Sequence, residues 1–197
     1  MGETARLFIA VPVAEEVRRA AARLIGGLRD SGADFKWVEP ENLHLTLRFL
    51  GATPRDRLPE IEALLRRAAQ RRRFEASFTG VGAFSSWDDP RVVWVGVGQG
   101  AGELAALAES LGPSEAGRPF AAHLTIGRRR GLDGLGAAAR MRRRPDDRKE
   151  VRWSAWAAAA QAGFPELRQM VDKIVLFESR LTPRGPVYLI RREQSLL

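Results

Sequence analysis

The segment Leu43–Leu50 (LHLTLRFL) constrains the fold of this chain more than any other part of it, because apolar and polar side chains alternate along most of its length. A period of two is typical of a β-strand with one buried face. In such a strand His44, Thr46 and Arg48 share the polar face, each about 6.5–7 Å from the next. We therefore predict a strand that presents an imidazole, a hydroxyl and a guanidinium on one side.

The tripeptide His-Leu-Thr that begins at His44 occurs a second time, beginning at His123, and the chain has no other histidine. In a strand His123 and Thr125 also share one face. In a regular strand Arg128 would point to the opposite face. It reaches the face of His123 and Thr125 only if the strand bends at Gly127. The repeat predicts two similar local scaffolds, each of which presents one imidazole.

Two imidazoles that face one cleft suit the opening of a cyclic phosphodiester. Histidine has its unperturbed pKa close to neutral pH, so one imidazole can take a proton from the attacking water while the other protonates the departing ribose oxygen. A threonine hydroxyl beside each imidazole can hydrogen-bond a phosphate oxygen as charge shifts in the transition state. We therefore predict His44 and His123 as the catalytic pair. The predicted phosphate-binding residues are Thr46, Thr125, Arg48 and Arg128, with a solvated surface position as the alternative for the two arginines.

The composition favours a mechanism without a metal ion or another cofactor. The chain has no cysteine, which excludes disulfides, thiol nucleophiles and thiolate metal sites. Its two histidines lack the His-x-x-x-His spacing, so a zinc site would need carboxylates to complete it. No apolar run approaches the roughly 18–20 residues of a membrane span, and Leu7–Val11 is too short for the core of a signal peptide. We expect a cytoplasmic protein that does not contact a membrane.

The charge balance is compatible with a nucleic-acid partner. The formal net charge is +8, from 32 basic and 24 acidic residues, and such a surface attracts polyanions. Arginine outnumbers lysine 29 to 3, however, which a compositional bias of the genome explains equally well. The Arg-rich segment Gly131–Glu150 fits a solvated surface better than a binding site.

Helical and strand patterns alternate along the 197 residues, which suffice for one substantial core or two closely packed lobes. We expect Gly51 to end the first histidine strand. Helices interleaved with mostly antiparallel strands indicate an α+β protein of two similar lobes. The expected helices span residues 14–29, 59–71, 102–111 and 154–162. The expected strands, besides the second histidine segment, span 6–11, 43–50, 74–84, 91–97, 173–179 and 187–191, and a short extended piece is expected over 35–38.

Besides the two His-Leu-Thr motifs, several further segments of the chain resemble those of a known family. They are Arg6–Ala10, Trp37–Val38, Pro40–Gly51, Pro119–Phe120, His123–Arg128, Leu176–Ser179 and Gly185–Tyr188. With these segments the chain resembles the two-histidine (2H) phosphoesterase superfamily, whose signature is a double His-x-Thr-x (HXTX) motif. It resembles most the RNA 2′,3′-cyclic phosphodiesterases of that superfamily, long called 2′-5′ RNA ligases. The resemblance covers nearly the whole length.

The resemblance implies a bilobed, pseudo-twofold α+β fold, one domain over residues 1–197. Two mostly antiparallel sheets are expected to line a central cleft, with helices on the outside. The resemblance also implies that His44 donates a proton to the leaving oxygen and that His123 is the base that activates water. Thr46 and Thr125 would hold the phosphate. From the residues alone, the two histidine roles are interchangeable.

The substrate that the resemblance implies is RNA with a 2′,3′-cyclic phosphate end, with tRNA fragments among the candidates. Hydrolysis would give a 2′-phosphate, and we expect a monomer. Three alternatives stay open from the sequence: a phosphodiesterase for a small cyclic nucleotide or an ADP-ribose cyclic phosphate, 2′-5′ RNA ligation, and a non-catalytic module that grips RNA ends. The last of these needs no second proton-transfer group, so the paired histidines disfavour it.

Overall fold

The computed structural model describes most of the chain, namely residues 3–30, 33–113, 120–130, 157–158, 160, 163–183 and 185–197. The Arg-rich segment 131–150 lies outside these residues, as does most of the predicted helix over 154–162, of which Ala157, Ala158 and Ala160 are helical.

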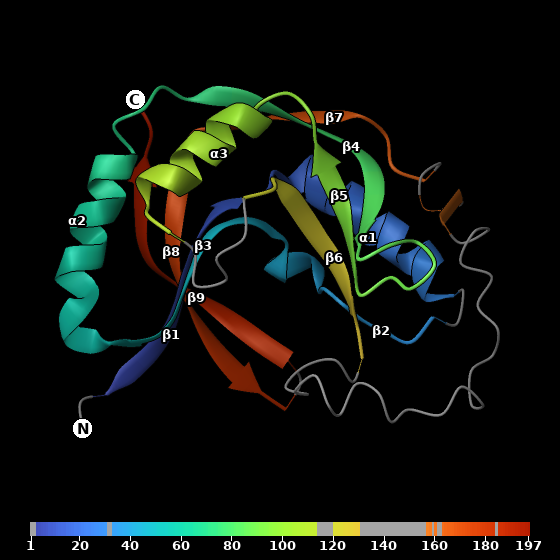
Figure 1. The fold of residues 1–197 in the computed structure, drawn as a ribbon, viewed down its shortest axis with the longest axis horizontal. Helices are drawn as coiled ribbons and strands as arrows, with labels where there is room; N and C mark the ends of the chain where they lie inside the picture. The colour runs from blue at the N-terminus through green and yellow to red at the C-terminus, as the bar shows by residue number, and fades with distance from the viewer. Residues whose placement is uncertain are drawn as a thin grey trace.

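Nine strands and three α-helices make up the described part of the chain (Figure 1). The strands are β1 (Thr4–Pro12), β2 (Phe35–Trp37), β3 (His44–Pro54), β4 (Phe74–Phe84), β5 (Val92–Val97), β6 (His123–Arg129), β7 (Leu167–Val171), β8 (Lys173–Thr182) and β9 (Gly185–Ser195). The helices are α1 (Glu15–Arg29), α2 (Leu58–Ala68) and α3 (Ala101–Ser110), with short 3-10 turns η1 (Pro40–Asn42) and η2 (Arg55–Arg57). The predicted elements in these ranges are confirmed, and β7 was not predicted.

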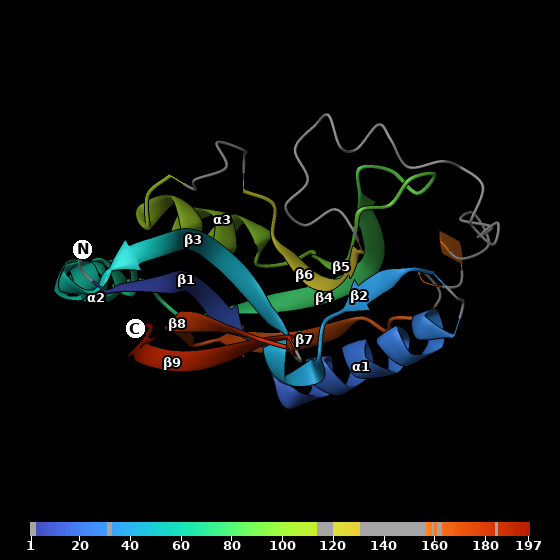
Figure 2. The ribbon, with the colours of Figure 1, turned by 90° about the horizontal axis from the view of Figure 1, so that it is seen from below.

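All nine strands belong to one antiparallel sheet, in the order β7-β4-β5-β6-β3-β1-β8-β9 with β2 on β6. The two histidine strands, β3 and β6, are neighbours in the middle of this order. The two halves of the sheet meet in a single ladder pair, Leu45 with Leu124. The α+β class and the antiparallel strands are as predicted, and the two expected sheets are the two halves of one curled sheet (Figure 2).

Strands β3 and β2 pair with the same edge of β6 at different places. β3 pairs with the start of β6, through Leu124, whereas β2 pairs with the end of β6, through Gly127, Arg128 and Arg129. The two histidine strands therefore diverge after one pair, and β2 satisfies the backbone groups of β6 beyond that point.

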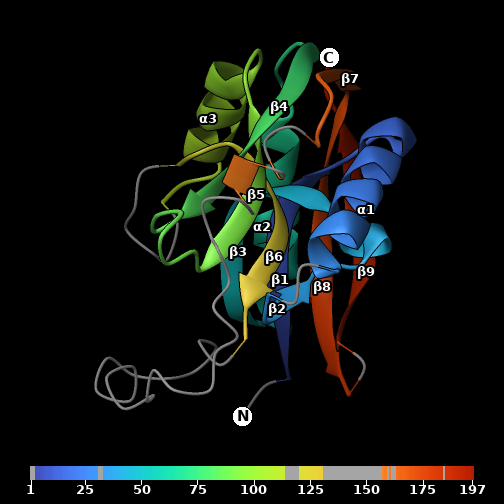
Figure 3. The ribbon, with the colours of Figure 1, turned by 90° about the vertical axis from the view of Figure 1, so that its right-hand side faces the viewer.

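The helices pack against different parts of the sheet. α1 packs against β2, β6 and β7, α2 against β8 and β9, and α3 against β3. Figure 3 shows α1 and α3 on opposite sides of the strands. The apolar positions that predicted α1, Val17, Ala21, Leu24 and Leu28, are all buried, as expected for an amphipathic helix. Within the described residues, no helix is both long and apolar enough to cross a bilayer.

The expected end of the first histidine strand at Gly51 is wrong. Leu7 of β1 pairs with Gly51 while Phe8 pairs with Phe49, so Leu50 is an extra residue in β3. Gly51 has a φ of 65°, which glycine adopts without steric cost. The glycine therefore lets the strand pass through a bulge and continue to Pro54.

Candidate active site

The two histidines begin the two central strands and project from the same face of the sheet, here called the front face. Leu45 pairs with Leu124, so these two leucines point to one face of the sheet. The residues before and after each leucine in its strand therefore point to the other face. The antiparallel direction turns His44 toward Thr125 and His123 toward Thr46. The single junction of the two halves thus gathers the four predicted motif side chains in one place.

Each imidazole is held by the backbone just before its own strand. His44 Nδ1 lies 2.6 Å from the carbonyl oxygen of Asn42, and His123 Nδ1 lies 2.7 Å from that of Ala121. A carbonyl oxygen only accepts, so Nδ1–H is the donor in both contacts. In the neutral state this leaves Nε2 of both rings as a proton acceptor. Sequence reasoning missed these contacts because a backbone carbonyl two residues earlier carries no side-chain signal.

Aromatic rings flank both histidines. The His44 ring centroid lies 4.8 Å from that of Phe8 and 5.3 Å from that of Tyr188, which meets it edge-on. His123 meets the ring of Phe84 edge-on at 4.9 Å. Sequence reasoning did not place these rings around the histidines, because strands far apart along the chain bring them there.

This environment holds both imidazoles neutral. Burial lowers the pKa of His44 to about 4, and the charge of Arg128 adds to the effect. Burial and Arg128 also lower the pKa of His123. In both cases the backbone hydrogen bond opposes the shift without cancelling it. At neutral pH the free protein therefore has two uncharged imidazoles.

A bulge in β3 moves Arg48 off the front face. Ala10 of β1 pairs with Thr46 but Ile9 pairs with Arg48, so Leu47 is an extra residue. Residues after a bulge change sides relative to those before it. The predicted common face of His44, Thr46 and Arg48 is therefore wrong for Arg48.

The guanidinium of Arg48 contacts the end of helix α3 and not the histidines. Its Nη1 donates to the carbonyl oxygen of Leu111, at the C-terminal end of α3. A cation is favourable there because the last carbonyls of a helix carry partial negative charge. Arg48 thus joins β3 to α3, on the face away from the histidines.

A matching bulge in β6 brings Arg128 onto the front face. Val93 of β5 pairs with Gly127 and Trp94 with Thr125, so Ile126 is the extra residue. This is the bend at Gly127 on which the predicted position of Arg128 depended. The charge of Arg128 lowers the pKa of both histidines and opposes the upward, burial-driven shift in the pKa of Tyr188. Arg128 therefore lies close to all three groups, whereas its contact with phosphate stays a prediction.

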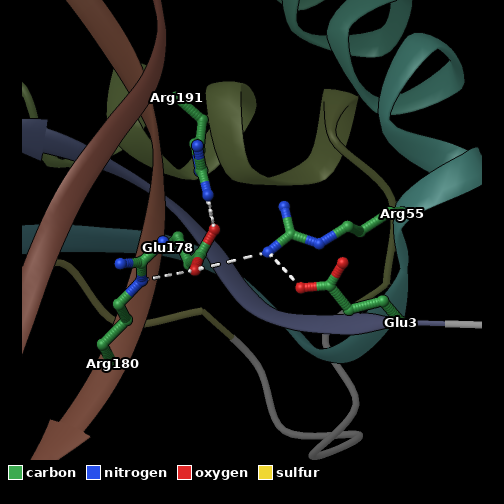
Figure 4. Close-up of polar contacts among 5 residues, drawn as sticks. All are labelled: Glu3, Arg55, Glu178, Arg180 and Arg191. Atoms are coloured by element: carbon green, nitrogen blue, oxygen red, sulfur yellow. Dashed lines mark hydrogen bonds and ion pairs between the residues drawn. The ribbon is translucent and has the colours of Figure 1, made fainter.

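A buried carboxylate anchors the β8–β9 hairpin, which carries Tyr188 to the site. Glu178 of β8 is 5% exposed and accepts hydrogen bonds from Arg180 Nε at 2.9 Å and Arg191 Nε at 2.7 Å. Arg55 lies 4.0 Å from the same carboxylate and 3.0 Å from Glu3 (Figure 4). The hydrogen bonds from Arg180 and Arg191 lower the pKa of Glu178. The cluster connects Glu3, just before β1, with η2, β8 and β9, and so holds in place the hairpin that carries Tyr188.

A groove of about 950 Å³ lies on the Arg128 and Tyr188 side of the site, and neither histidine lines it. Asn42, Arg128 and Tyr188 are among the residues that line it, and it extends between β2 and the β8–β9 hairpin. Among the described residues, no three metal-ligating side chains come together.

Known proteins resemble this chain in sequence over nearly its whole length. Residues 11–94 match the family model described as LigT like Phosphoesterase. An RNA 2′,3′-cyclic phosphodiesterase of Archaeoglobus fulgidus is 37% identical over 190 residues, which cover 93% of this chain and 96% of the relative. One from Thermotoga maritima is 34% identical over 195 residues, with coverages of 95% and 94%.

Solved structures show the same fold. A Thermus thermophilus protein superposes with a TM-score of 0.73 at 31% identity, over 97% of each chain. E. coli LigT in complex with 3′-AMP has a TM-score of 0.69 at 22% identity, over 98% of this chain and 99% of LigT, and supports the fold alone. The chain therefore belongs to the two-histidine phosphoesterases, as a member of their LigT-like RNA 2′,3′-cyclic phosphodiesterase family.

Proposed function

We propose that this protein hydrolyses 2′,3′-cyclic phosphate ends of RNA to 2′-phosphates, with His44 and His123 as the acid–base pair and without a metal ion. The observation that carries the proposal is the pair of imidazoles on one face, each with Nδ1 bound to a carbonyl and Nε2 left for the reaction. The printed activity of its relatives supports the choice of substrate. A chain with two histidines and no cysteine supports an acid–base mechanism over a metal-dependent one.

The reaction needs one base and one acid. Water attacks phosphorus while the base takes a proton from it at Nε2, and a new P–O bond forms. The bond between phosphorus and O3′ breaks, and the acid gives its proton to O3′. The phosphate stays on O2′. Thr46 and Thr125, on the same face, donate hydroxyl hydrogen bonds to the non-bridging oxygens as charge shifts onto them.

We assign the acid to His44 and the base to His123, following the family resemblance. Burial keeps His44 neutral in the free protein by lowering its pKa, so it must gain its proton when substrate binds. The phosphate anion favours the protonated imidazole, because an opposite charge nearby raises the pKa of a histidine. His123 is then the neutral partner that accepts the proton of water.

The proposal is tested with an oligonucleotide that ends in a 2′,3′-cyclic phosphate, in the presence of EDTA. The wild type should open the ring to a 2′-phosphate. His44→Ala and His123→Ala should each lose at least about 10²-fold in rate, the range for a general acid or base. Retention of full activity by either folded variant, or complete loss of wild-type activity in EDTA, would contradict the mechanism.

A change of leaving group separates the two histidine roles. Catechol cyclic phosphate releases an aryl oxide, which needs less help from a proton donor than a ribose hydroxyl does. His44→Ala should therefore be impaired much less on catechol cyclic phosphate than on RNA, whereas His123→Ala should be impaired similarly on both. The reverse pattern would exchange the two assignments.

A further inference from the structure

Two cations face each other across the β2–β6 ladder. Lys36 of β2 pairs directly with Arg128 of β6 in the antiparallel register. Side chains directly opposite in such a pair lie on one face, with Cβ atoms about 4.5–5.5 Å apart. Two like charges in this position destabilise the sheet. An anion bound between them would remove that cost.

The acidic residues beside this pair do not neutralise it. Each of them is paired with another arginine: Asp34 with Arg130 at 3.4 Å and Glu39 with Arg29 at 3.8 Å. Neither Lys36 nor Arg128 forms an ion pair within the described part of the chain. The ammonium group of Lys36 is on an exposed residue, so it is available to a ligand.

Lys36 and Arg128 both line the groove described above. The charge of Arg128 acts on both imidazoles, whereas Lys36 is not among the charges that shift the pKa of either histidine, so Arg128 is the cation nearer to the histidines. The groove of about 950 Å³ lies at the upper end of the range of about 300–1,000 Å³ for single small-molecule sites. It therefore has room for more than the terminal nucleotide.

We propose that Lys36 binds the phosphodiester that precedes the terminal nucleotide of the substrate, while Arg128 faces the cyclic phosphate. An RNA strand repeats a negative charge at every nucleotide, and two neighbouring cations along a groove match two successive phosphates. The inference rests on the proposed function and narrows its substrate to oligonucleotides with at least one internucleotide phosphate. A nucleoside 2′,3′-cyclic phosphate would lack the group that Lys36 holds.

The test compares two substrates with the same terminal nucleotide, cytidine 2′,3′-cyclic phosphate and a dinucleotide that ends in it. We expect the wild-type kcat/KM to be about tenfold higher on the dinucleotide, a typical gain for a charge-assisted phosphate contact. Lys36→Gln should lose most of this preference and keep its rate on the mononucleotide. Lys36→Arg should retain the preference, because it keeps the charge.

Lys173→Gln is the matched control, because it removes the same charge from an ion pair with Glu193 at 3.2 Å, away from the groove. It should leave both rates unchanged. Salt gives a second readout: the slope of log kcat/KM against log salt for the dinucleotide should become shallower by about 0.7 in Lys36→Gln.

The outcomes separate this inference from the proposed function. Turnover of both substrates at equal rates by the wild type would overturn the role of Lys36 and leave the activity standing. An equal loss on both substrates in Lys36→Gln would also overturn it, because the residue would then act on the cyclic phosphate or on the fold. No turnover of either substrate by the wild type would overturn both proposals.

Discussion

Phe49 and Arg128 occupy equivalent positions on the two histidine strands. Each lies three residues after the threonine of its motif, and in each strand one extra residue returns it to the front face. The Phe49 ring lies 6.1 Å from that of Phe8, which itself packs on His44. The two halves therefore share a backbone plan but present different chemistry, an aromatic ring on one side and a guanidinium on the other.

This asymmetry predicts different effects for the two arginines of the motif strands. Arg128→Ala should lower kcat/KM on the cyclic-phosphate oligonucleotide by about 10- to 100-fold, because it removes the charge-assisted contact that we predict with the reacting phosphate. Its thermal stability should change little, because Arg128 is exposed and forms no ion pair within the described residues.

Arg48→Ala should show the opposite pattern. It removes the hydrogen bond from Arg48 to Leu111 at the end of α3, and the loss of such a charged contact costs about 1.5–3 kcal/mol in free energy of unfolding. Chemical denaturation would measure that loss, while kcat/KM at a temperature where the variant is folded should stay within a few-fold of the wild type. A large loss of activity without a loss of stability would return Arg48 to the phosphate site.

Gly127 should not tolerate a side chain, because the Trp37 ring occupies the space. A Cβ on Gly127 would lie 2.7 Å from that indole. Gly127→Ala should cost about 1–3 kcal/mol in stability through overpacking, and it should weaken the dinucleotide preference by displacing β2. Gly26→Ala, on an exposed helix position with open space around it, is the control and should stabilise the protein by about 0.5–1 kcal/mol. Equal effects of the two substitutions would contradict this account.

The stability of the protein should rise with pH between about 4 and 6.5. The pKa of His44 falls from 6.5 to about 4 on folding, so within this window the unfolded chain binds more protons than the native one. Above pH 6.5 His44 is neutral in both the folded and the unfolded chain, so it does not lower the free energy of unfolding. That free energy declines as the pH falls from 6.5 toward 4. Denaturation midpoints measured at several pH values should show this slope, and His44→Gln should reduce it. A slope unchanged in His44→Gln would assign it to other groups.

The buried Glu178 cluster should matter for stability more than an exposed ion pair does. Glu178→Gln removes the charge that three arginines share and should cost about 2 kcal/mol, the range for hydrogen bonds to charged groups. Because the pKa of Glu178 is lowered, its contribution is present above the ordinary pKa of a glutamate and is lost in acid. Glu60→Gln, which breaks an exposed pair with Arg57, should have no measurable effect.

The alternation of side chains was sufficient to place the motif residues but not to follow the strands past them. His44 and Thr46 share the front face as period two predicts, and Arg48 does not, because a leucine at position 47 fits a regular strand and a bulge equally well. In β6 the bend could be anticipated, since Gly127 interrupts the pattern. The difference lies in the partner strands, whose register decides where an extra residue is accommodated.

Long-range pairing was equally invisible in the sequence. Nothing in the segment Phe35–Trp37 indicates that it pairs with β6 and places Lys36 opposite Arg128. The rings of Phe8 and Tyr188 around His44 depend in the same way on which strands become neighbours. The local pattern predicts which residues carry the chemistry, whereas the surroundings of those residues depend on which strands become neighbours.

Each imidazole is oriented by a backbone carbonyl, so the same Nδ1 hydrogen bond serves the proposed acid and the proposed base. In the proposed hydrolysis His44 gives up a proton while His123 takes one from water. After the step His44 is neutral and His123 is protonated, which is the reverse of the protonation state in which the step began. Before the next substrate is opened, that proton must cross the cleft or exchange with solvent. The bound 2′-phosphate meanwhile faces a protein in the protonation state that ring closure would need, so each turnover is complete only once the product leaves or that proton exchanges.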